Sequence, residues 1–233
     1  MKHKAKIIDI IEETKEAKTY LLEKPEQFNW NEGSHTRFGL AWFEQGEKPN
    51  KKLFRHMSIM TLPSEGKVGF TTKIPGSSSE FKNKLSKLKI GDEIVFFKLG
   101  SRMRLRRCNK PVVLLSMGVG IATMRPLILS FVNDKTNVPF VVNMNINSSG
   151  EFVYKNELDK LENDDFKNYW IESRRDFYEK LNHLIDANDA IYYIVGDEFF
   201  IKDIIVKLKN KNVDSTDIIL DKREEVIHGY YGL

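Results

Sequence analysis

The sequence predicts two domains of different build, an antiparallel β-barrel followed by an open parallel sheet with helices on both faces. Three observations lead to this fold class. The first half reads as short apolar or alternating strands separated by turn residues. The second half alternates apolar strands with amphipathic helices. The pattern changes from short strands to alternating strands and helices near Lys110-Pro111. This change places the two domains at residues 1–109 and 110–233.

The strands expected in the first half are short segments bounded by glycine, proline, asparagine or aspartate, the residues that favour turns. They are Ile7–Glu12, Thr19–Leu22, Phe38–Phe43, Phe54–Met60, Lys67–Ile74 and Glu93–Lys98. Several short strands of this kind with little helix are typical of an antiparallel barrel or sandwich.

One helix is expected between the last two of these strands. Phe81, Leu85 and Leu88 share one helical face, and Ser77 with Glu80 forms the S-x-x-E pattern of a capping box. The serines at 77–79 therefore crowd a helix N-terminus, where hydroxyl and amide groups can bind phosphate. Capping alone explains them equally well without a ligand.

The second half opens with VVLLSM, an unbroken apolar strand of the kind that is buried on both faces of a parallel sheet. The expected strands are Val112–Met117, Phe140–Met144, Asn168–Ser173, Ala190–Val195 and Asp217–Leu220. The helices expected between them are Arg125–Val132, Tyr154–Leu161, Tyr178–Leu184 and Phe199–Lys209. Ligands bind such a sheet at the carboxyl ends of its strands.

Composition excludes several classes of protein. Of the 233 residues 41% are hydrophobic and 30% are charged, the balance of a globular chain. The net charge of +4 is too small and too scattered for a nucleic-acid binder. The single cysteine, Cys108, allows neither a disulfide framework nor a cysteine-ligated cluster. The histidines have no metal-ligand spacing with it, so no metal site is expected.

The localisation expected is cytoplasmic, with no membrane insertion. The N-terminal segment MKHKAKIIDIIEETKEAK meets charges before any long apolar run, unlike a signal peptide. The longest apolar run, Val112–Val132, is interrupted by Arg125 and Pro126 and is not a membrane helix.

Glycines follow the opening strand of the second half. Gly118 and Gly120 in SMGVGIAT allow backbone amides to approach a pyrophosphate at the start of a helix. Thr123 stands where a dinucleotide motif has its third glycine. The acid expected on the ribose about twenty residues on is absent. A tight strand-to-helix turn explains the two glycines equally well.

Two further strand ends carry polar groups. Ser173, Arg174 and Arg175 can hold an extra phosphate through charge-assisted hydrogen bonds, although a solvated basic loop explains them too. Gly196 and Asp197 end the next strand, where a plain turn with a helix N-cap is the alternative to a ligand site.

The strand RHMSIM, Arg55 to Met60, places a permanent cation and a hydroxyl in an apolar segment. With the motifs above it resembles the ferredoxin-NADP reductase-like superfamily, and the resemblance covers nearly the whole chain. In that family a flavin-binding barrel with an Arg-x-aromatic-Ser/Thr strand precedes a nicotinamide-nucleotide domain. The resemblance implies that Arg55 binds the flavin phosphates and that Ser58 is the catalytic residue near the reactive edge of the isoalloxazine ring.

The other flavin contacts come from the same resemblance. His56 and Met57 lie in the flavin-binding strand; the side chain of His56 points away, and Met57 replaces an aromatic residue that stacks on the ring. Gly76, Ser77, Ser78 and Ser79 match the family's small-residue loop on the pyrophosphate, which favours FAD over FMN. The ending HGYYGL is similar to the family's Phe-x-Gly-Tyr, so Tyr230 or Tyr231 would shield the flavin.

The resemblance also assigns the nucleotide site of the second half. Gly118, Gly120 and Thr123 match the family's pyrophosphate loop, and Gly196 with Asp197 matches its Gly-Pro-x-x-Met segment. Ser173 and Arg174 match the pair that holds the 2′-phosphate, with help from Arg175. Tyr178 would lie against the adenine. NADPH is therefore favoured over NADH.

The function implied is that of an FAD-dependent oxidoreductase, which takes a hydride from NADPH and passes electrons to an external acceptor. A flavodoxin, a ferredoxin, a ferric chelate or a quinone would serve. Two alternatives are an electron-transfer subunit of a larger oxidoreductase and a non-catalytic flavin- or nucleotide-binding sensor. The arginines of SRMRLRR, at 102, 104, 106 and 107, form either a docking patch for an acidic electron carrier or chelate, or a solvated strand edge.

Overall fold

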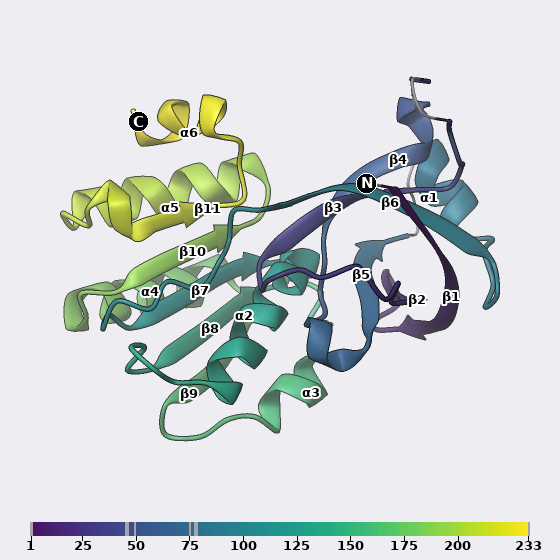
Figure 1. The fold of residues 1–233 in the computed structure, drawn as a ribbon. Helices are drawn as coiled ribbons and strands as arrows, with labels where there is room; N and C mark the ends of the chain where they lie inside the picture. Colours follow the sequence, from purple (N-terminus) through teal and green to yellow (C-terminus); the bar gives the residue numbers. More distant parts are fainter. Residues whose placement is uncertain (1, 45–46, 49, 75, 77–78, 233) are drawn as a thin grey trace. The chain divides into compact units, whose positions relative to one another are not determined.

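The chain consists of two compact units, Met1–Ser101 and Arg102–Leu233 (Figure 1). A computed structural model describes residues 2–44, 47–48, 50–74, 76 and 79–232. The division lies before the expected junction of Asn109 and Lys110, and the residues between are hydrogen-bonded to the second unit.

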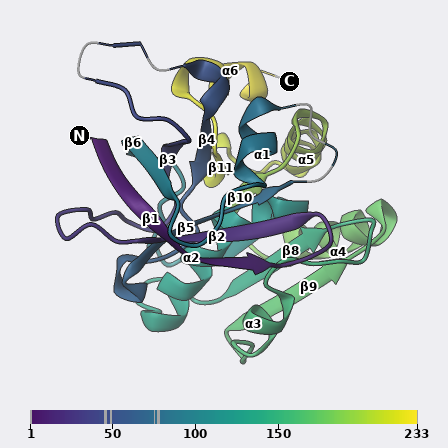
Figure 2. The ribbon, with the colours of Figure 1, turned by 90° about the vertical axis from the view of Figure 1, so that its right-hand side faces the viewer.

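The first unit is built on one antiparallel sheet with the strand order β4-β3-β6-β1-β2-β5. Its strands are β1 (Lys2–Glu12), β2 (Ala17–Glu23), β3 (Ser34–Gly39), β4 (Phe54–Ser58), β5 (Lys67–Lys73) and β6 (Glu93–Ser101). Beyond β4, the amide of Met60 donates to the carbonyl of Gly69 in β5 at 2.8 Å, so the two outer strands approach each other. The strands of the first unit are therefore those of an antiparallel barrel, as predicted (Figure 2).

Aromatic side chains fill the interior of this unit. Phe38 of β3, Phe70 of β5 and Phe96 of β6 are fully buried, and the ring centroids of Phe38 and Phe70 are 4.3 Å apart. The α-helix of the described part of this unit, α1 (Glu80–Leu85), buries Phe81 and Leu85 in the same core. Two single 3-10 turns, η1 (Lys51–Leu53) and η2 (Pro63–Glu65), flank β4. The helix predicted from its apolar spacing is therefore confirmed.

The strand predicted at Phe38–Phe43 is wrong in its bounds, because β3 covers Ser34–Gly39. Ser34, His35 and Thr36 are polar but buried, and the hydroxyl of Thr36 donates to the carbonyl of Phe97 at 2.8 Å. Phe43 lies beyond the strand, with its ring edge-on to Phe97 at 5.0 Å. The strand thus begins with buried polar residues, and the aromatic Phe43 lies in the loop after it, which is the reverse of the apolar pattern on which the prediction rested.

The second unit is a five-stranded parallel sheet with the order β11-β10-β7-β8-β9. Its strands are β7 (Val112–Met117), β8 (Val141–Ile146), β9 (Phe166–Ile171), β10 (Ile191–Val195) and β11 (Ile218–Leu220). Chain order runs outward from β7 to one side through β8 and β9, and to the other through β10 and β11. This doubly wound topology confirms the prediction and creates a switch point between β7 and β10, where such sheets bind ligands.

Helices alternate with the parallel strands. They are α2 (Ile121–Asn133), α3 (Lys155–Asp159), α4 (Arg174–Ala187), α5 (Glu198–Asn210) and α6 (Glu224–Tyr231), with 3-10 turns η3 (Gly118–Gly120) and η4 (Ser215–Asp217). Phe177 of α4 and Phe200 of α5 pack together in the core cluster that includes Val113 and Leu115 of β7. Figure 1 shows α6 beside α5, with which it makes contact.

Some predicted bounds in this unit are wrong. The helix expected from Arg125 begins at Ile121 and contains Pro126 in its interior. Ser173, expected at the end of a strand, instead caps α4, which starts earlier than predicted, at Arg174. In α2 the buried face already begins at Ile121, and in α4 the exposed Arg174 and Arg175 form the first turn, which Ser173 caps.

The segment before β7 is bonded to the second unit and is not a strand beyond Ser101. The hydroxyl of Tyr193 in β10 donates to the carbonyl of Arg104 and accepts from the amide of Arg106, each at 2.8 Å. Arg107 donates to the carbonyl of Asp134 at 2.7 Å. Among the described residues, no helix is long and apolar enough to cross a membrane.

Candidate cofactor and nucleotide sites

Arg55 of β4 lies at the centre of a polar cluster in the first unit. Its Nη2 atom donates to the hydroxyl of Ser79 at 2.6 Å, and its Nη1 atom donates to the carbonyl of Phe54 at 2.7 Å. The guanidinium carbon lies 5.6 Å from the ring centroid of Phe81 in α1. Ser79 is the N-cap residue of α1 and makes no capping bond with its side chain. The structure thus joins the predicted phosphate-binding arginine to the predicted serine loop.

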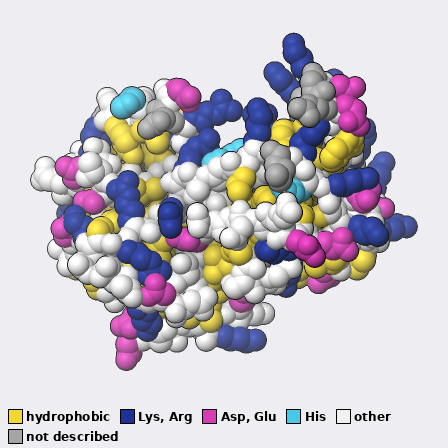
Figure 3. Space-filling model, in the orientation of Figure 1, with side chains coloured by type: hydrophobic (Ala, Val, Ile, Leu, Met, Phe, Trp, Pro, Cys, Tyr) yellow, Lys and Arg dark blue, Asp and Glu magenta, His cyan; other side chains and the backbone are white. Residues whose placement is uncertain are grey.

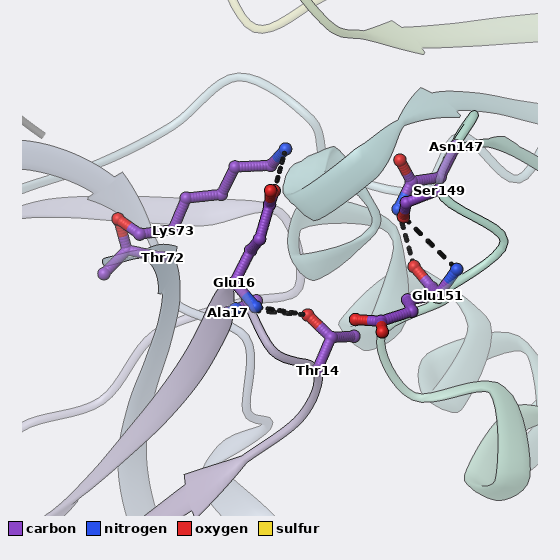
Figure 4. Close-up of polar contacts among 8 residues, drawn as sticks. All are labelled: Thr14, Glu16, Ala17, Thr72, Lys73, Asn147, Ser149 and Glu151. Atoms are coloured by element: carbon purple, nitrogen blue, oxygen red, sulfur yellow. Dashed lines mark hydrogen bonds and ion pairs between the residues drawn. The ribbon is translucent and has the colours of Figure 1, made fainter. Parts of the chain in front are cut away.

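Lys82 in α1 adds a second cation to this cluster. Burial lowers the pKa of Lys82, and the positive charges of Arg55 and Lys73 lower it further. Lys73, at the end of β5, is paired with Glu16 at 3.0 Å (Figure 4). Like charges that repel one another in this way favour a bound anion, and a phosphate group would relieve the repulsion.

The rest of the serine loop is only partly covered by the structure. Gly76 has φ +69°, a left-handed backbone that favours glycine, and a side chain there would meet no atom within 4 Å. Ser77 and Ser78 lie outside the described residues, and so does the predicted capping box that begins at Ser77. The described N-cap is Ser79.

Alternation along β4 divides the RHMS strand between two faces. Arg55 pairs across the sheet with the buried Phe38, and Met57 packs against the same core while remaining partly exposed. Ser58 pairs with His35, whose ring centroid lies 4.2 Å from that of His56. His56 is exposed, in keeping with a side chain that points away from Arg55 and Met57.

The glycine loop of the second unit lies at the switch point of the sheet. Gly118 has φ +52°, and a Cβ atom on Gly120 would lie 2.9 Å from the carbonyl oxygen of Val195 at the end of β10. Only glycine allows this close approach. The buried side chain of Asn145 donates to the carbonyl of Gly118 at 3.1 Å and to Ser116 at 2.8 Å, which holds the loop against β8.

Three other residues expected at this edge have clear structural roles. Thr123 is buried in the first turn of α2. Asp197 caps α5, since its carboxylate accepts from the amide of Phe200 at 2.8 Å. A side chain on Gly196 would lie 2.4 Å from the ring of Phe200. The helix N-cap that the sequence allowed as an alternative to a ligand site is therefore present. Gly196 also lies near Gly120, because it follows Val195, whose carbonyl oxygen approaches Gly120.

The basic pair after β9 starts α4. The hydroxyl of Ser173 accepts from the amide of Asp176 at 3.1 Å and so caps the helix. Arg174 is exposed, and its charge acts on the pKa of Tyr178 one turn along. Arg175 is also exposed and lies 3.4 Å from Asp176 and 3.9 Å from Glu179. Arg174 is thus the more available cation of the pair.

Tyr178 is held between α4 and α5. Its hydroxyl donates to Asp203, and the Lys207 ammonium lies 4.3 Å from its ring centroid. Burial raises the pKa of Tyr178 to about 12, with a further contribution from the bond to Asp203.

The two C-terminal tyrosines lie in α6 and pack against the core of the second unit. The hydroxyl of Tyr231 donates to the carbonyl of Ile218 in β11 at 2.5 Å, and its own carbonyl accepts from Lys209 at 2.7 Å. Tyr230 is partly exposed, with Lys222 5.7 Å from its ring centroid. Of the two, Tyr230 has the side chain with fewer hydrogen bonds to its own unit.

Three of the four arginine side chains of SRMRLRR bind groups within the second unit, and Arg104 contributes its backbone carbonyl. Arg102 lies 3.6 Å from Asp221, Arg106 donates to the carbonyl of Thr216, and Arg107 donates to that of Asp134. On the face drawn in Figure 3, lysine and arginine side chains are interspersed with acidic ones. These bonds hold the segment to the second unit. Neither of the two interpretations of the arginines, a docking patch or a solvated strand edge, predicted this role. Among the described residues, no group of histidine, cysteine and acidic side chains could hold a metal ion.

Two contributors to these sites were missed in the sequence. Lys82 follows Ser79 by three residues in a helix, a spacing that places both at the same turn and could have revealed it. Asn145 carried no signal, because a buried asparagine in a strand looks like an ordinary break in an apolar run.

No protein-family model matches the chain. The curated proteins likewise contain no match. Solved structures do match. A ferredoxin-NADP⁺ reductase from Neisseria gonorrhoeae with bound FAD and NADP is 16% identical, with a TM-score of 0.76, and the match covers 94% of this chain and 98% of that chain.

A mutant ferredoxin-NADP⁺ reductase from Plasmodium falciparum with 2′P-AMP is also 16% identical, with a TM-score of 0.77. The match covers 94% of this chain and 96% of that chain. The CS-b5R domains of human Ncb5or in the NAD⁺ form are 17% identical, with a TM-score of 0.76. That match covers 95% of this chain and 70% of the other. At such identities the likeness establishes the fold. The chain has the two-domain fold of ferredoxin-NADP reductase-like proteins, and the predicted resemblance is confirmed at that level.

Proposed function

We propose that this chain is an FAD-dependent NAD(P)H oxidoreductase that prefers NADPH and passes electrons to an external acceptor. The observation that carries the proposal is the contact between Arg55 and Ser79 beside Lys82. Residues far apart in the sequence supply a guanidinium, a hydroxyl and an ammonium to one cluster. Such a cluster suits the pyrophosphate of a dinucleotide flavin.

The residues around the cluster fit the rest of the cofactor. Gly76, Ser77, Ser78 and Ser79 would line the pyrophosphate, with Arg55 as its main charge partner. Met57, partly exposed beside the core, offers a polarizable sulfur in place of an aromatic ring.

The second unit would hold the nicotinamide nucleotide at its switch point. Gly118 and Gly120 would let backbone amides approach the pyrophosphate, since neither residue carries a side chain. Ser173 and Arg174 would bind the 2′-phosphate, which distinguishes NADPH from NADH. A structural neighbour that was solved with FAD and NADP supports this pairing of ligands.

When bound, FAD supplies the redox chemistry, accepting a hydride from NADPH and passing electrons on singly or as a pair. The chain's own contribution is orientation. Ser58 would place a hydroxyl at the reactive edge of the ring, and Tyr230 or Tyr231 would exclude water from it. The acceptor we propose is an acidic electron-carrier protein, a ferric chelate or a quinone.

An anaerobic absorbance titration tests the proposal. Purified protein should show flavin bands near roughly 375 and 450 nm, and these should bleach with NADPH at a lower concentration than with NADH. Flavin that stays oxidised would indicate a binding-only protein. Protein that takes up no flavin from excess FAD would overturn the assignment.

A further inference from the structure

Asn145 of β8 is a buried amide that contacts the first residue of the Gly118–Gly120 loop. It is 1% exposed and pairs with Ser116 of β7 across the parallel sheet. Its Nδ2 atom donates to the hydroxyl of Ser116 at 2.8 Å and to the carbonyl of Gly118 at 3.1 Å. Because a carbonyl oxygen only accepts, the amide must turn its NH₂ group toward Gly118. Both hydrogens of that group are therefore used, one of them on the loop.

The stability of the sheet does not account for this amide. The Oδ1 atom of Asn145 is buried and has no hydrogen-bond partner among the described residues. A buried acceptor without a partner costs stability, and an apolar side chain of similar volume would avoid that cost. What an amide supplies here, and a leucine would not, is a donor for the carbonyl of Gly118.

The bond fixes the direction of the peptide between Gly118 and Val119. The carbonyl of Gly118 also accepts from the amide of Ile121, so both of its lone pairs are occupied. In a trans peptide the carbonyl and the following amide point in opposite directions. With the Gly118 oxygen held by Asn145, the N–H of Val119 therefore points away from the buried amide. The loop is partly exposed, so a ligand can reach this donor.

A glycine at the start of this loop needs such a constraint. Gly118 has φ +52°, and a glycine has access to more backbone conformations than any other residue. The 3-10 turn η3 leads directly into α2, and the first N–H groups of a helix have no partner within it. If the peptide after Gly118 rotated, it would present a carbonyl oxygen beside these donors. An oxygen there would repel a phosphate instead of binding it.

We propose that Asn145 is a positioning residue for the nucleotide pyrophosphate. By holding the carbonyl of Gly118, it directs the amide of Val119 toward the phosphate oxygens. The inference rests on the proposed function and names the side chain that orders its glycine loop before the nucleotide binds. Asn145 does not touch the ligand; it lowers the conformational freedom that the loop would otherwise lose on binding.

The test is calorimetric titration of the full-length protein, loaded with FAD, with two probes. NADP⁺ carries the pyrophosphate, and adenosine 2′-monophosphate lacks it. Asn145→Leu should weaken the binding of NADP⁺ by about tenfold, the effect of one misdirected hydrogen bond to a charged group. The same variant should bind adenosine 2′-monophosphate as tightly as the wild type does, because this probe does not reach the loop.

Asn143→Leu is the matched control. Asn143 lies two residues earlier on the same face of β8, is fully buried, and also leaves its Oδ1 atom without a partner among the described residues. Its Nδ2 atom donates to Asn168 at 3.0 Å and not to the glycine loop. The control should bind both probes like the wild type. If leucine prevents folding at either position, Asn145→Ala and Asn143→Ala provide the same comparison.

The outcomes separate the inference from the function on which it rests. If the wild type binds NADP⁺ and Asn145→Leu binds it equally well, the positioning role is overturned while the proposed function stands. Equal losses with both probes, or an equal loss of NADP⁺ binding in Asn143→Leu, would also overturn it, because the effect would then come from a general disturbance of the sheet. If the wild type does not bind NADP⁺, the proposed nucleotide site fails and this inference fails with it.

Discussion

The side chain of Arg55 donates to the hydroxyl of Ser79 at 2.6 Å, although the two residues are 24 positions apart. The bond connects a strand of the barrel with the start of α1, and it places a permanent charge where a helix begins. The Ser79 side chain makes no capping bond to its own helix, so within this contact it acts on the arginine rather than on the helix end.

Arg55→Ala should lower the affinity for FAD by about 10- to 100-fold, the effect of losing one charge-assisted hydrogen bond to phosphate. Arg55→Lys should fall between the wild type and alanine, because a lysine retains charge but not the planar donor geometry. Equilibrium titration of flavin-free protein with FAD measures both. Arg37→Ala, on neighbouring β3, is the control; unchanged FAD affinity in Arg55→Ala would exclude the phosphate role.

Lys82→Met should stabilise the flavin-free protein by less than about 1 kcal/mol and weaken its binding of FAD. The pKa of Lys82 is lowered in the folded state, so the unfolded chain binds its proton more tightly, and the charged form destabilises the fold. Wild-type stability should therefore rise with pH between the lowered pKa and the ordinary value near 10.5.

Urea unfolding of both proteins across this pH range measures the effect. The difference in the free energy of unfolding between Lys82→Met and the wild type should shrink as the pH rises. A difference that grows instead would show that Lys82 is stabilised by an anion of the protein itself.

Ser173→Asp with Arg174→Ala should raise the Michaelis constant for NADPH by at least about tenfold more than that for NADH. Aspartate preserves the N-cap on the amide of Asp176, so the change places a repulsive charge at the 2′-phosphate without unfolding α4. Steady-state kinetics with both nucleotides measures the ratio. Lys211→Ala, which removes an ion pair to Asp186 at the opposite ends of α5 and α4, is the control. Equal effects on both nucleotides would refute the 2′-phosphate assignment.

Gly120→Ala should destabilise the second unit by about 1–3 kcal/mol and raise the Michaelis constant for NADPH, because the new methyl group would collide with the carbonyl of Val195. Gly229→Ala in α6 is the matched control, since a Cβ atom there meets nothing within 4 Å. Thermal unfolding and kinetics test both variants. If the Gly120→Ala protein is as stable as the control, the Gly118–Gly120 loop can move away from Val195 without a loss of stability.

Tyr178→Phe should cost about 1–2 kcal/mol of stability at neutral pH, through the lost bond to Asp203. The pKa of Tyr178 is raised from 10.0 to about 12 in the folded state, so this stabilisation is complete below pH 10 and is lost as the pH rises toward 12. Denaturation at pH 8 and at pH 11.5 measures the change. Equal stability of the two proteins at pH 8 would show that the hydroxyl bond does not contribute, and a difference that is unchanged at pH 11.5 would show that the pKa is not raised.

The sequence predicted elements best where burial and periodicity agree. Val112–Met117 was predicted with its observed bounds because every residue of that strand is apolar or small and all but Met117 are fully buried. The strand at Ser34–Gly39 was placed too late, because its first three residues are polar and yet buried, which no local pattern reveals. The start of α2 was placed too late, at Arg125, although the buried Ile121 and Met124 precede it. The start of α4 was missed because Ser173 and Arg174 were assigned to a strand end, whereas they form the capped first turn of the helix.

The candidate sites show the same division. Single residues such as Arg55 and Gly118 were recognised from motifs. What brings Arg55 to Ser79, or Gly120 to Val195, is tertiary packing between segments distant in the chain. Lys82 and Asn145 act only through such contacts, so their contributions became visible with the fold.

The Tyr193 hydroxyl determines where this protein can be dissected. It bonds the backbone of both Arg104 and Arg106, which precede the first parallel strand. A fragment that begins at Lys110 would leave a buried phenol without either partner, at a cost of about 1–3 kcal/mol. A fragment that begins at Arg102 retains both bonds. The arginine-rich segment is thus the first piece of the second unit, and a protease that separates the halves should leave it attached there.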